Sequence, residues 1–178
     1  MKKNVEPIDI KKALKALNKE MAAKKVSDVI YTLGGAALYL MGYDERATTD
    51  VDDLRDVMEG SIYECSKRVA KKLGISEFWL NTGAAPIQKF FDENWKKKCS
   101  LVFSDTNLKV YAVDRQTLIN TKLAATCQRA QGGDENDLIW LKSTKKELKL
   151  AKKYVKKNYS DVPIGVIDAF IEAVLDGQ

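Results

Sequence analysis

The sequence predicts a mixed α+β protein in which helices flank a small mixed sheet and a helical region forms the C-terminal part. Two segments, 28–33 and 100–114, are rich in the β-branched and aromatic residues typical of strands. Two others, 8–25 and 60–73, repeat apolar residues at the spacing of amphipathic helices. We therefore expect a core over 1–120 and a helical region over 121–178 that packs on it, so that the two can form one compact domain.

The first third of the chain alternates between helix and strand. The helix over 8–25 follows Pro7 and places one apolar stripe on the core: Ile10, Ala13, Leu14, Leu17 and Met21. The strand over 28–33 ends at Gly34-Gly35, and a short helix then closes at Gly42. A threonine-rich stretch within 47–58 predicts a second strand that enters from a turn.

The remaining elements follow from start and stop signals. A helix from about 60 to 73 ends at Gly74, and Pro86 begins a helix that contains Phe90, Phe91 and Trp95. Residues 100–114 form a hairpin about the polar turn 104–107. From residue 115 onward the chain is helical, with breaks at 132–133 and near 163.

Composition excludes several functions. The 178 residues carry a net charge of +5 and no histidine, which removes imidazole-based triads and histidine metal sites. The three cysteines, Cys65, Cys99 and Cys127, have no metal-type spacing. No apolar run approaches the roughly 20 residues of a membrane span, so we expect a cytoplasmic protein with no membrane partner.

One basic segment stands out near the C-terminus. Residues 142–157 contain eight lysines in sixteen positions. A run of this kind is most often a solvated helix face, and it is also suited to the phosphate backbone of a nucleic acid. If the chain acts on RNA, we expect the RNA backbone here.

Two glycines and a group of acids suggest the chemistry. In a strand, alternate side chains share a face, so Asp50 and Asp52 point the same way while Asp53 faces away. Two adjacent carboxylates repel each other unless a cation such as Mg²⁺ neutralises them. Gly34 and Gly35 allow phosphates to approach the backbone, because glycine has no Cβ. A solvated turn is the simpler explanation of each feature taken alone.

Two ordered motifs resemble the DNA polymerase β-like nucleotidyltransferase superfamily, and within it the bacterial minimal and AbiEii-like enzymes. The first motif is Gly-Gly followed by Arg-x-Thr-x-Asp-x-Asp, matched by Gly34-Gly35, Arg46, Thr48, Asp50 and Asp52. The second is a strand and a helix with Lys and then Arg, followed by Asp-x-x-Asp. It is matched by Lys122, Arg129, Asp134 and Asp137.

The resemblance implies a nucleotidyltransferase fold and the transfer of a nucleoside monophosphate from a nucleoside triphosphate (NTP). Asp50 and Asp52 would hold Mg²⁺ or Mn²⁺, and Gly34 and Gly35 would bind the phosphates. Lys122 would supply a charge to a phosphate and Arg129, seven residues on, would share its helix face. Arg46 and Thr48 would bind phosphate or brace the acid-bearing loop. Asp134 is also explained as a helix cap, and Asp137 as a partner of Arg129.

Members of this superfamily also bring a third carboxylate from a later strand. The strand interior at 108–113 contains no acid, so the candidates are Asp105 in the turn and Asp114 at the strand end. We favour Asp114, although a helix N-cap explains it equally.

Three functions therefore remain open. The first is a toxin or phage-defence nucleotidyltransferase that modifies RNA such as tRNA and is paired with an antitoxin protein. The second is a small-molecule, antibiotic-modifying nucleotidyltransferase. The third is a catalytically degenerate member that binds RNA or protein.

Overall fold

A computed structural model describes residues 7–129 and 134–178. The chain divides into two compact units, Met1–Val113 and Asp114–Gln178, and each is described here by itself. The break expected at 132–133 lies outside the described residues. No helix in the described part of the chain is long and apolar enough to span a membrane.

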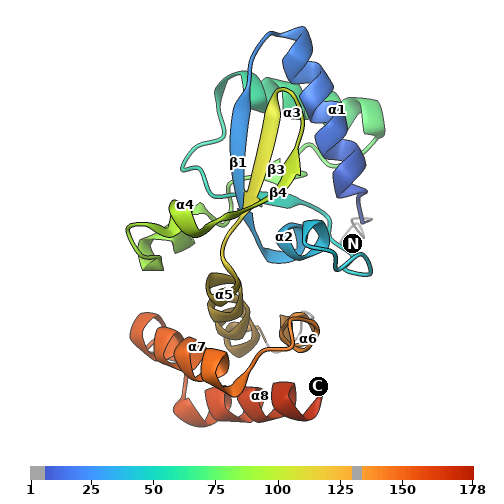
Figure 1. Cartoon of the computed structure of the whole chain (residues 1–178). Helices are drawn as coiled ribbons and strands as arrows, with labels where there is room; N and C mark the ends of the chain where they lie inside the picture. Colours follow the sequence, from blue (N-terminus) through green and yellow to red (C-terminus); the bar gives the residue numbers. More distant parts are fainter. Residues whose placement is uncertain (1–6, 130–133) are drawn as a thin grey trace, which may run out of the picture. The chain divides into compact units, whose positions relative to one another are not determined.

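The first unit is an α+β unit, as the sequence predicts (Figure 1). Its elements are α1 (Ile10–Ala23), β1 (Asp28–Leu33), α2 (Gly34–Leu40), β2 (Val51–Asp53), α3 (Gly60–Leu73), β3 (Leu80–Asn81), the 3-10 helix η1 (Ala85–Phe90), α4 (Trp95–Lys98), β4 (Ser100–Ser104) and β5 (Leu108–Ala112).

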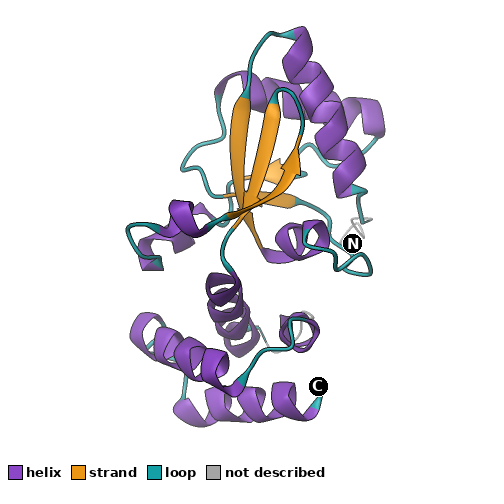
Figure 2. Ribbon diagram, viewed as in Figure 1, coloured by secondary structure: helices purple, strands orange, loops and turns teal. Residues whose placement is uncertain are grey.

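The described strands form one mixed sheet in the order β3-β2-β1-β5-β4 (Figure 2). β1 is parallel to β5 and antiparallel to β2, with Leu33 opposite Asp52. β2 is parallel to β3, with Asp52 opposite Asn81, and the β4–β5 hairpin is antiparallel. The acids of β2 therefore lie between the end of β1 and the short strand β3.

One face of the sheet packs against α1 and α3, which lie side by side (Figure 1). The core joins Leu14 and Leu17 of α1 and Val69 of α3 to Ile30 and Val110 of the sheet, all fully buried. These positions are the ones that the helical and strand periodicities predict. The α+β fold class is thus confirmed. The predicted elements α1, β1 and α3 and the β4–β5 hairpin are confirmed as well.

The stretch between α3 and the hairpin differs from the prediction. The single helix expected from Pro86 to Trp95 is wrong, because η1 ends at Phe90 and α4 begins at Trp95. Phe91 has an extended backbone, and the Asp92 side chain accepts a hydrogen bond from the Asn94 N–H at 3.0 Å. This aspartate turn competes with helix continuation. The two-residue strand β3 was not predicted.

The second unit is helical. Its described helices are α5 (Arg115–Gln128), α6 (Asp134–Trp140), α7 (Lys145–Asn158) and α8 (Ile164–Asp176). Pro163 precedes α8 and ends the preceding loop, as predicted. Thr144 and Glu147 form a reciprocal capping box at the start of α7, and Arg115 of α5 donates to Glu147 at 2.7 Å. The capping residue therefore also links α5 to α7.

The Glu147 contacts predict an acid-sensitive helical unit. The Arg115 hydrogen bond, supported by donors from Thr144, lowers the pKa of Glu147 from 4.5 to about 2. A lowered native pKa stabilises the fold above the unfolded-state value and is lost as pH falls. We expect the contribution of Glu147 to the stability of residues 115–178 to be lost from about pH 4.5 to about pH 2, and Glu147→Gln to reduce the acid response of this unit.

Hydrogen exchange monitored by mass spectrometry across this pH range measures the effect on the helical unit alone. Glu172→Gln, on the exposed side of α8, is the matched control because it removes a carboxylate outside the capping box. An equal acid response in wild type and Glu147→Gln would contradict the assignment.

Candidate active site

The Gly34-Gly35 pair, called the glycine turn below, begins α2 at the end of β1 and lies directly beside an acid of β2. Gly34 has a φ of +73°, a conformation that costs a residue with a side chain about 1–2 kcal/mol. A Cβ at Gly34 would lie 3.5 Å from Oδ2 of Asp52. The sequence predicts that the glycines and the acids act together, and the structure places Gly34 against Asp52.

The second glycine contacts the loop that carries the acids. A Cβ at Gly35 would lie 3.0 Å from Oγ1 of Thr48 and 3.8 Å from the guanidinium carbon of Arg46. Thr48 donates from Oγ1 to the carbonyl of Asp50 at 3.2 Å, and Arg46 donates to the carbonyl of Ala47 at 2.7 Å. Both contacts hold the loop conformation, which corresponds to the bracing role considered for these residues.

Asn81 of β3 links the two acids and is a site residue that the sequence analysis missed. Its Nδ2 donates to Oδ2 of Asp50 at 3.1 Å, and it lies opposite Asp52 in the β2–β3 register. Cross-strand partners project on the same face of a sheet, so Asn81 and Asp52 are neighbours there. In the sequence, a lone asparagine near a glycine is typical of a turn. Only the pairing of β2 with β3 shows that Asn81 lies beside the two acids.

Asp53 is separate from this pair, as strand alternation predicts. It is buried and accepts one hydrogen bond from the side chain of Arg55 and one from the Arg55 backbone N–H, and Arg55 also pairs with Asp28 at 3.0 Å. Burial raises the pKa of Asp53, and the Arg55 guanidinium opposes this rise. Asp53 thus belongs to a structural ion pair that joins β1 to β2.

Asp114 is the N-cap of α5. Its Oδ1 accepts from the Thr117 N–H at 3.1 Å and its Oδ2 accepts from the Thr117 hydroxyl at 2.6 Å. Both carboxylate oxygens therefore accept hydrogen bonds from Thr117, in the first turn of α5. The alternative explanation given by the sequence, a helix cap, accounts for this residue.

The residues of the second motif gather into one buried ion cluster within the helical unit. The Lys122 ammonium lies 2.9 Å from Asp134 and 2.6 Å from Asp137, and all three side chains are buried. Arg129 pairs with Asp134 at 3.0 Å, and its side chain is 65% exposed. The structure pairs Arg129 with Asp134, the first residue of α6, instead of with the expected Asp137, and Asp137 pairs with Lys122.

The structure thus assembles the predicted residues in two groups, one in each unit. Gly34, Gly35, Arg46, Thr48, Asp50 and Asp52 meet in the first unit, and Lys122 and Arg129 meet around Asp134 in the second. Among the described residues, no three or more aspartate, glutamate, cysteine or histidine side chains form a group that could hold a metal.

The fold and this site define an α+β protein in which a glycine turn faces Asp52 of β2, with Asp50 directly before the strand, an arrangement suited to phosphate chemistry. A family model described as "Nucleotidyltransferase of unknown function (DUF6036)" matches residues 9–163. The chain belongs to this nucleotidyltransferase family, which confirms the resemblance at the level of the transferase class. No curated protein and no solved structure gives a significant match.

Proposed function

We propose that this protein transfers a nucleoside monophosphate from an NTP to an RNA such as tRNA, with Mg²⁺ or Mn²⁺ as cofactor. The observation that carries the proposal is the approach of Gly34 to Asp52, with Asp50 held beside them by Asn81. Carboxylates next to a backbone that has no Cβ can serve a cation and a phosphate at the same place.

The donor set suits a hard divalent cation. Magnesium is commonly held by one or two carboxylates together with substrate phosphates, and it does not require a closed protein cage. Asp50 and Asp52 would be its protein ligands, and when bound it would neutralise charge that develops on the phosphoryl oxygens. Asp114 has no part in the proposed site because its carboxylate caps α5.

The chain's own residues would position the reactants. Gly34 and Gly35 place no side chain of their own beside the triphosphate, while Thr48 and Asn81 hold the loop and the Asp50 carboxylate. An acceptor hydroxyl oxygen attacks the α-phosphorus, its proton passes to solvent, and pyrophosphate leaves. Within the second unit, the Arg129 side chain is 65% exposed whereas Lys122 is buried, so Arg129 is the cation of the second motif that is accessible to a phosphate.

The positive charge of the chain indicates which class of molecule would accept the nucleoside monophosphate. The chain is basic, with a net charge of +5, and exposed lysines occur along α1 at Lys12, Lys15 and Lys19. A polyanion suits such a surface better than a cationic antibiotic. The resemblance to AbiEii-like enzymes supports a bacterial toxin or phage-defence role with a cognate antitoxin as partner.

Transfer of label tests the proposal. The full chain is incubated with each α-labelled NTP and Mg²⁺ or Mn²⁺, with total RNA in one set of reactions and an aminoglycoside in another, and the products are analysed by electrophoresis. Label in RNA that depends on the divalent ion supports the proposal. Label found in an aminoglycoside would indicate the antibiotic-modifying alternative, and absence of transfer to any acceptor would indicate a binding module.

Gly34→Ala should lower both stability and transfer. The positive φ predicts a loss of about 1–2 kcal/mol in the free energy of unfolding, and the added Cβ faces Asp52 where the phosphates would approach. Gly74→Ala is the matched control, because Gly74 has a φ of +65° and a Cβ added there would meet no atom within 4 Å.

Chemical denaturation and the transfer assay, applied to both variants, separate the two effects. Gly74→Ala should lose a similar amount of stability and keep its transfer rate. Equal transfer by Gly34→Ala and Gly74→Ala would show that Gly34 serves only the backbone conformation.

A further inference from the structure

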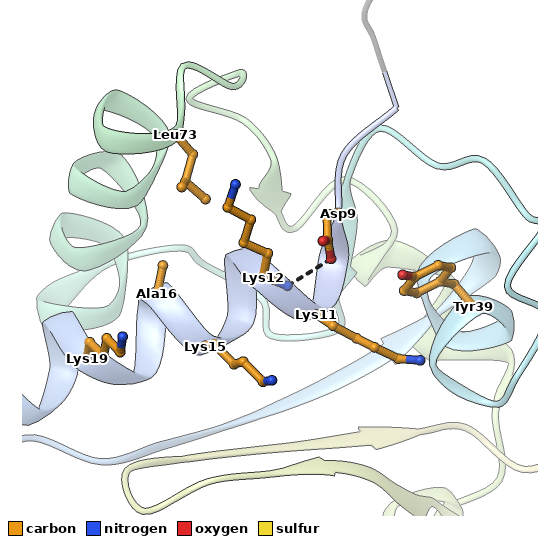
Figure 3. Close-up of a pocket in the computed structure, with 8 residues that line it drawn as sticks. All are labelled: Asp9, Lys11, Lys12, Lys15, Ala16, Lys19, Tyr39 and Leu73. Carbon is orange, nitrogen blue, oxygen red and sulfur yellow. Dashed lines mark hydrogen bonds between the residues drawn. The ribbon is translucent and has the colours of Figure 1, made fainter.

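The exposed side of α1 carries a row of lysines beside an open pocket. The row, called the lysine row below, consists of Lys11, Lys12, Lys15 and Lys19, all exposed. With Tyr39 of α2 and Leu73 of α3, these side chains line a pocket of about 550 Å³ (Figure 3). Positions 11, 15 and 19 are four residues apart and share one helix face, over about 12 Å at the helical rise of 1.5 Å per residue.

The positive charge of the lysine row is largely uncompensated. The acid that lines the pocket is Asp9, whose carboxylate accepts the Lys12 backbone N–H at 2.9 Å as the N-cap of α1. Lys11 pairs with Asp44 at 3.4 Å, an exposed contact that is weak in water. Within residues 7–129 and 134–178, Lys12, Lys15 and Lys19 form no ion pair.

The row begins next to the loop of the candidate active site. The backbone N–H of Ile8, just before α1, donates to the carbonyl of Thr48 at 2.9 Å. Lys11 reaches Asp44 of the same loop, and its ammonium also lies 5.2 Å from the centre of the Tyr39 ring. From there the lysine row runs along α1, away from the acids.

A linear array of this length suits an extended polyanion. Each strand of a DNA duplex carries about one charge per 3.4 Å of helix axis, and at that spacing about 12 Å of lysines spans about three phosphates. The triphosphate of a single nucleotide would be used at the glycine turn, and it is the acceptor that must extend away from the reacting end. The row therefore matches the backbone of the acceptor strand.

We propose that the lysine row of α1 binds the phosphate backbone of the acceptor RNA and leads its reacting end to the loop of Asp50 and Asp52. This role of the lysine row rests on the proposed function, and it makes the row the surface that selects the acceptor. It places the RNA on the first unit, whereas the sequence alone indicates the lysines of α7.

Binding of a short, fluorescein-labelled, single-stranded RNA to the full chain tests the proposal. Anisotropy is measured over a series of KCl concentrations, without NTP or divalent metal. The test variant is Lys12→Gln/Lys15→Gln/Lys19→Gln, which leaves the Lys11–Asp44 contact in place. The matched control is Lys146→Gln/Lys149→Gln/Lys153→Gln on α7, which removes the same charge from exposed positions. Circular dichroism checks that both variants are folded.

For the α1 variant we expect an affinity about tenfold lower at fixed salt. Its plot of log affinity against log salt should be shallower by about 2, because each single-strand phosphate contact contributes about 0.7. The α7 variant should remain near wild type. Equal losses in both variants, or a loss confined to the α7 variant, would overturn the proposal, as would unchanged binding by the α1 variant.

Failure of the lysine-row proposal can be distinguished from failure of the proposed function, because RNA binding is measured without catalysis. If wild type binds RNA through the lysine row but transfers no nucleotide, the binding surface stands and the transferase proposal falls. If label is transferred to RNA while the α1 variant binds RNA as wild type does, the transferase proposal stands and this surface is excluded.

Discussion

Asp52→Asn should lower kcat/KM for nucleotidyl transfer by about a thousandfold or more. The substitution keeps the shape of the side chain and removes the negative charge beside Gly34. Divalent cations contribute several kcal/mol to the stabilisation of phosphoryl transfer, and each 1.36 kcal/mol corresponds to a factor of ten in rate. Loss of a ligand charge should therefore nearly abolish transfer, and Asp50→Asn should behave in the same way.

The transfer assay with labelled NTP and RNA measures this effect, and a manganese titration shows whether higher metal concentration restores activity. Glu59→Gln is the matched control because it removes an exposed carboxylate from the segment that follows β2. Full activity in both aspartate variants would show that Asp50 and Asp52 hold no catalytic metal. A loss of folding in these variants would instead indicate a structural role, which circular dichroism detects.

Lys122→Met should destabilise the helical unit by about 3–5 kcal/mol. The ammonium lies between the buried carboxylates of Asp134 and Asp137, and removing it leaves Asp137 buried without its lysine. Burial of a charge whose partner has been removed is among the most costly changes in a folded protein. Hydrogen exchange of peptides from residues 115–178 measures this loss within the full chain.

Two further variants test whether the loss of stability in Lys122→Met comes from breaking the buried ion pair. Lys149→Met on the exposed side of α7 should change stability by no more than about 0.5 kcal/mol. Lys122→Met/Asp137→Leu should recover much of the loss, since an apolar pair can replace a buried ion pair. If Lys122→Met keeps wild-type stability and only weakens NTP binding, the lysine serves a phosphate, as its motif implies.

Much of the first unit could be predicted because its elements carry local signals. Apolar spacing, β-branched runs and the glycines at 34 and 74 determine where α1, β1, α2 and α3 begin and end. Prediction failed between Pro86 and Trp95, where a single aspartate side chain diverts the chain into a turn. It failed again at β3, which is too short to show a periodic pattern.

Some residues of the candidate site could likewise be predicted from the sequence, and one could not. Gly34-Gly35 and Asp50-x-Asp52 lie within a short span, and alternation along one strand is enough to separate Asp53 from the pair. Asn81 comes to Asp50 only through the pairing of β2 with β3, and no local pattern encodes that pairing.

Local chemistry along the chain thus decides the fold class, the ends of most elements and the presence of an acid and glycine motif. Tertiary structure decides which of the charged residues face water and which face each other. Lys122 and Lys15 are both helical lysines, yet the first is enclosed by two carboxylates and the second is exposed on α1. The physical reason is that burial and charge pairing depend on neighbours distant in sequence, whereas helix and strand periodicity depends on the nearest few residues.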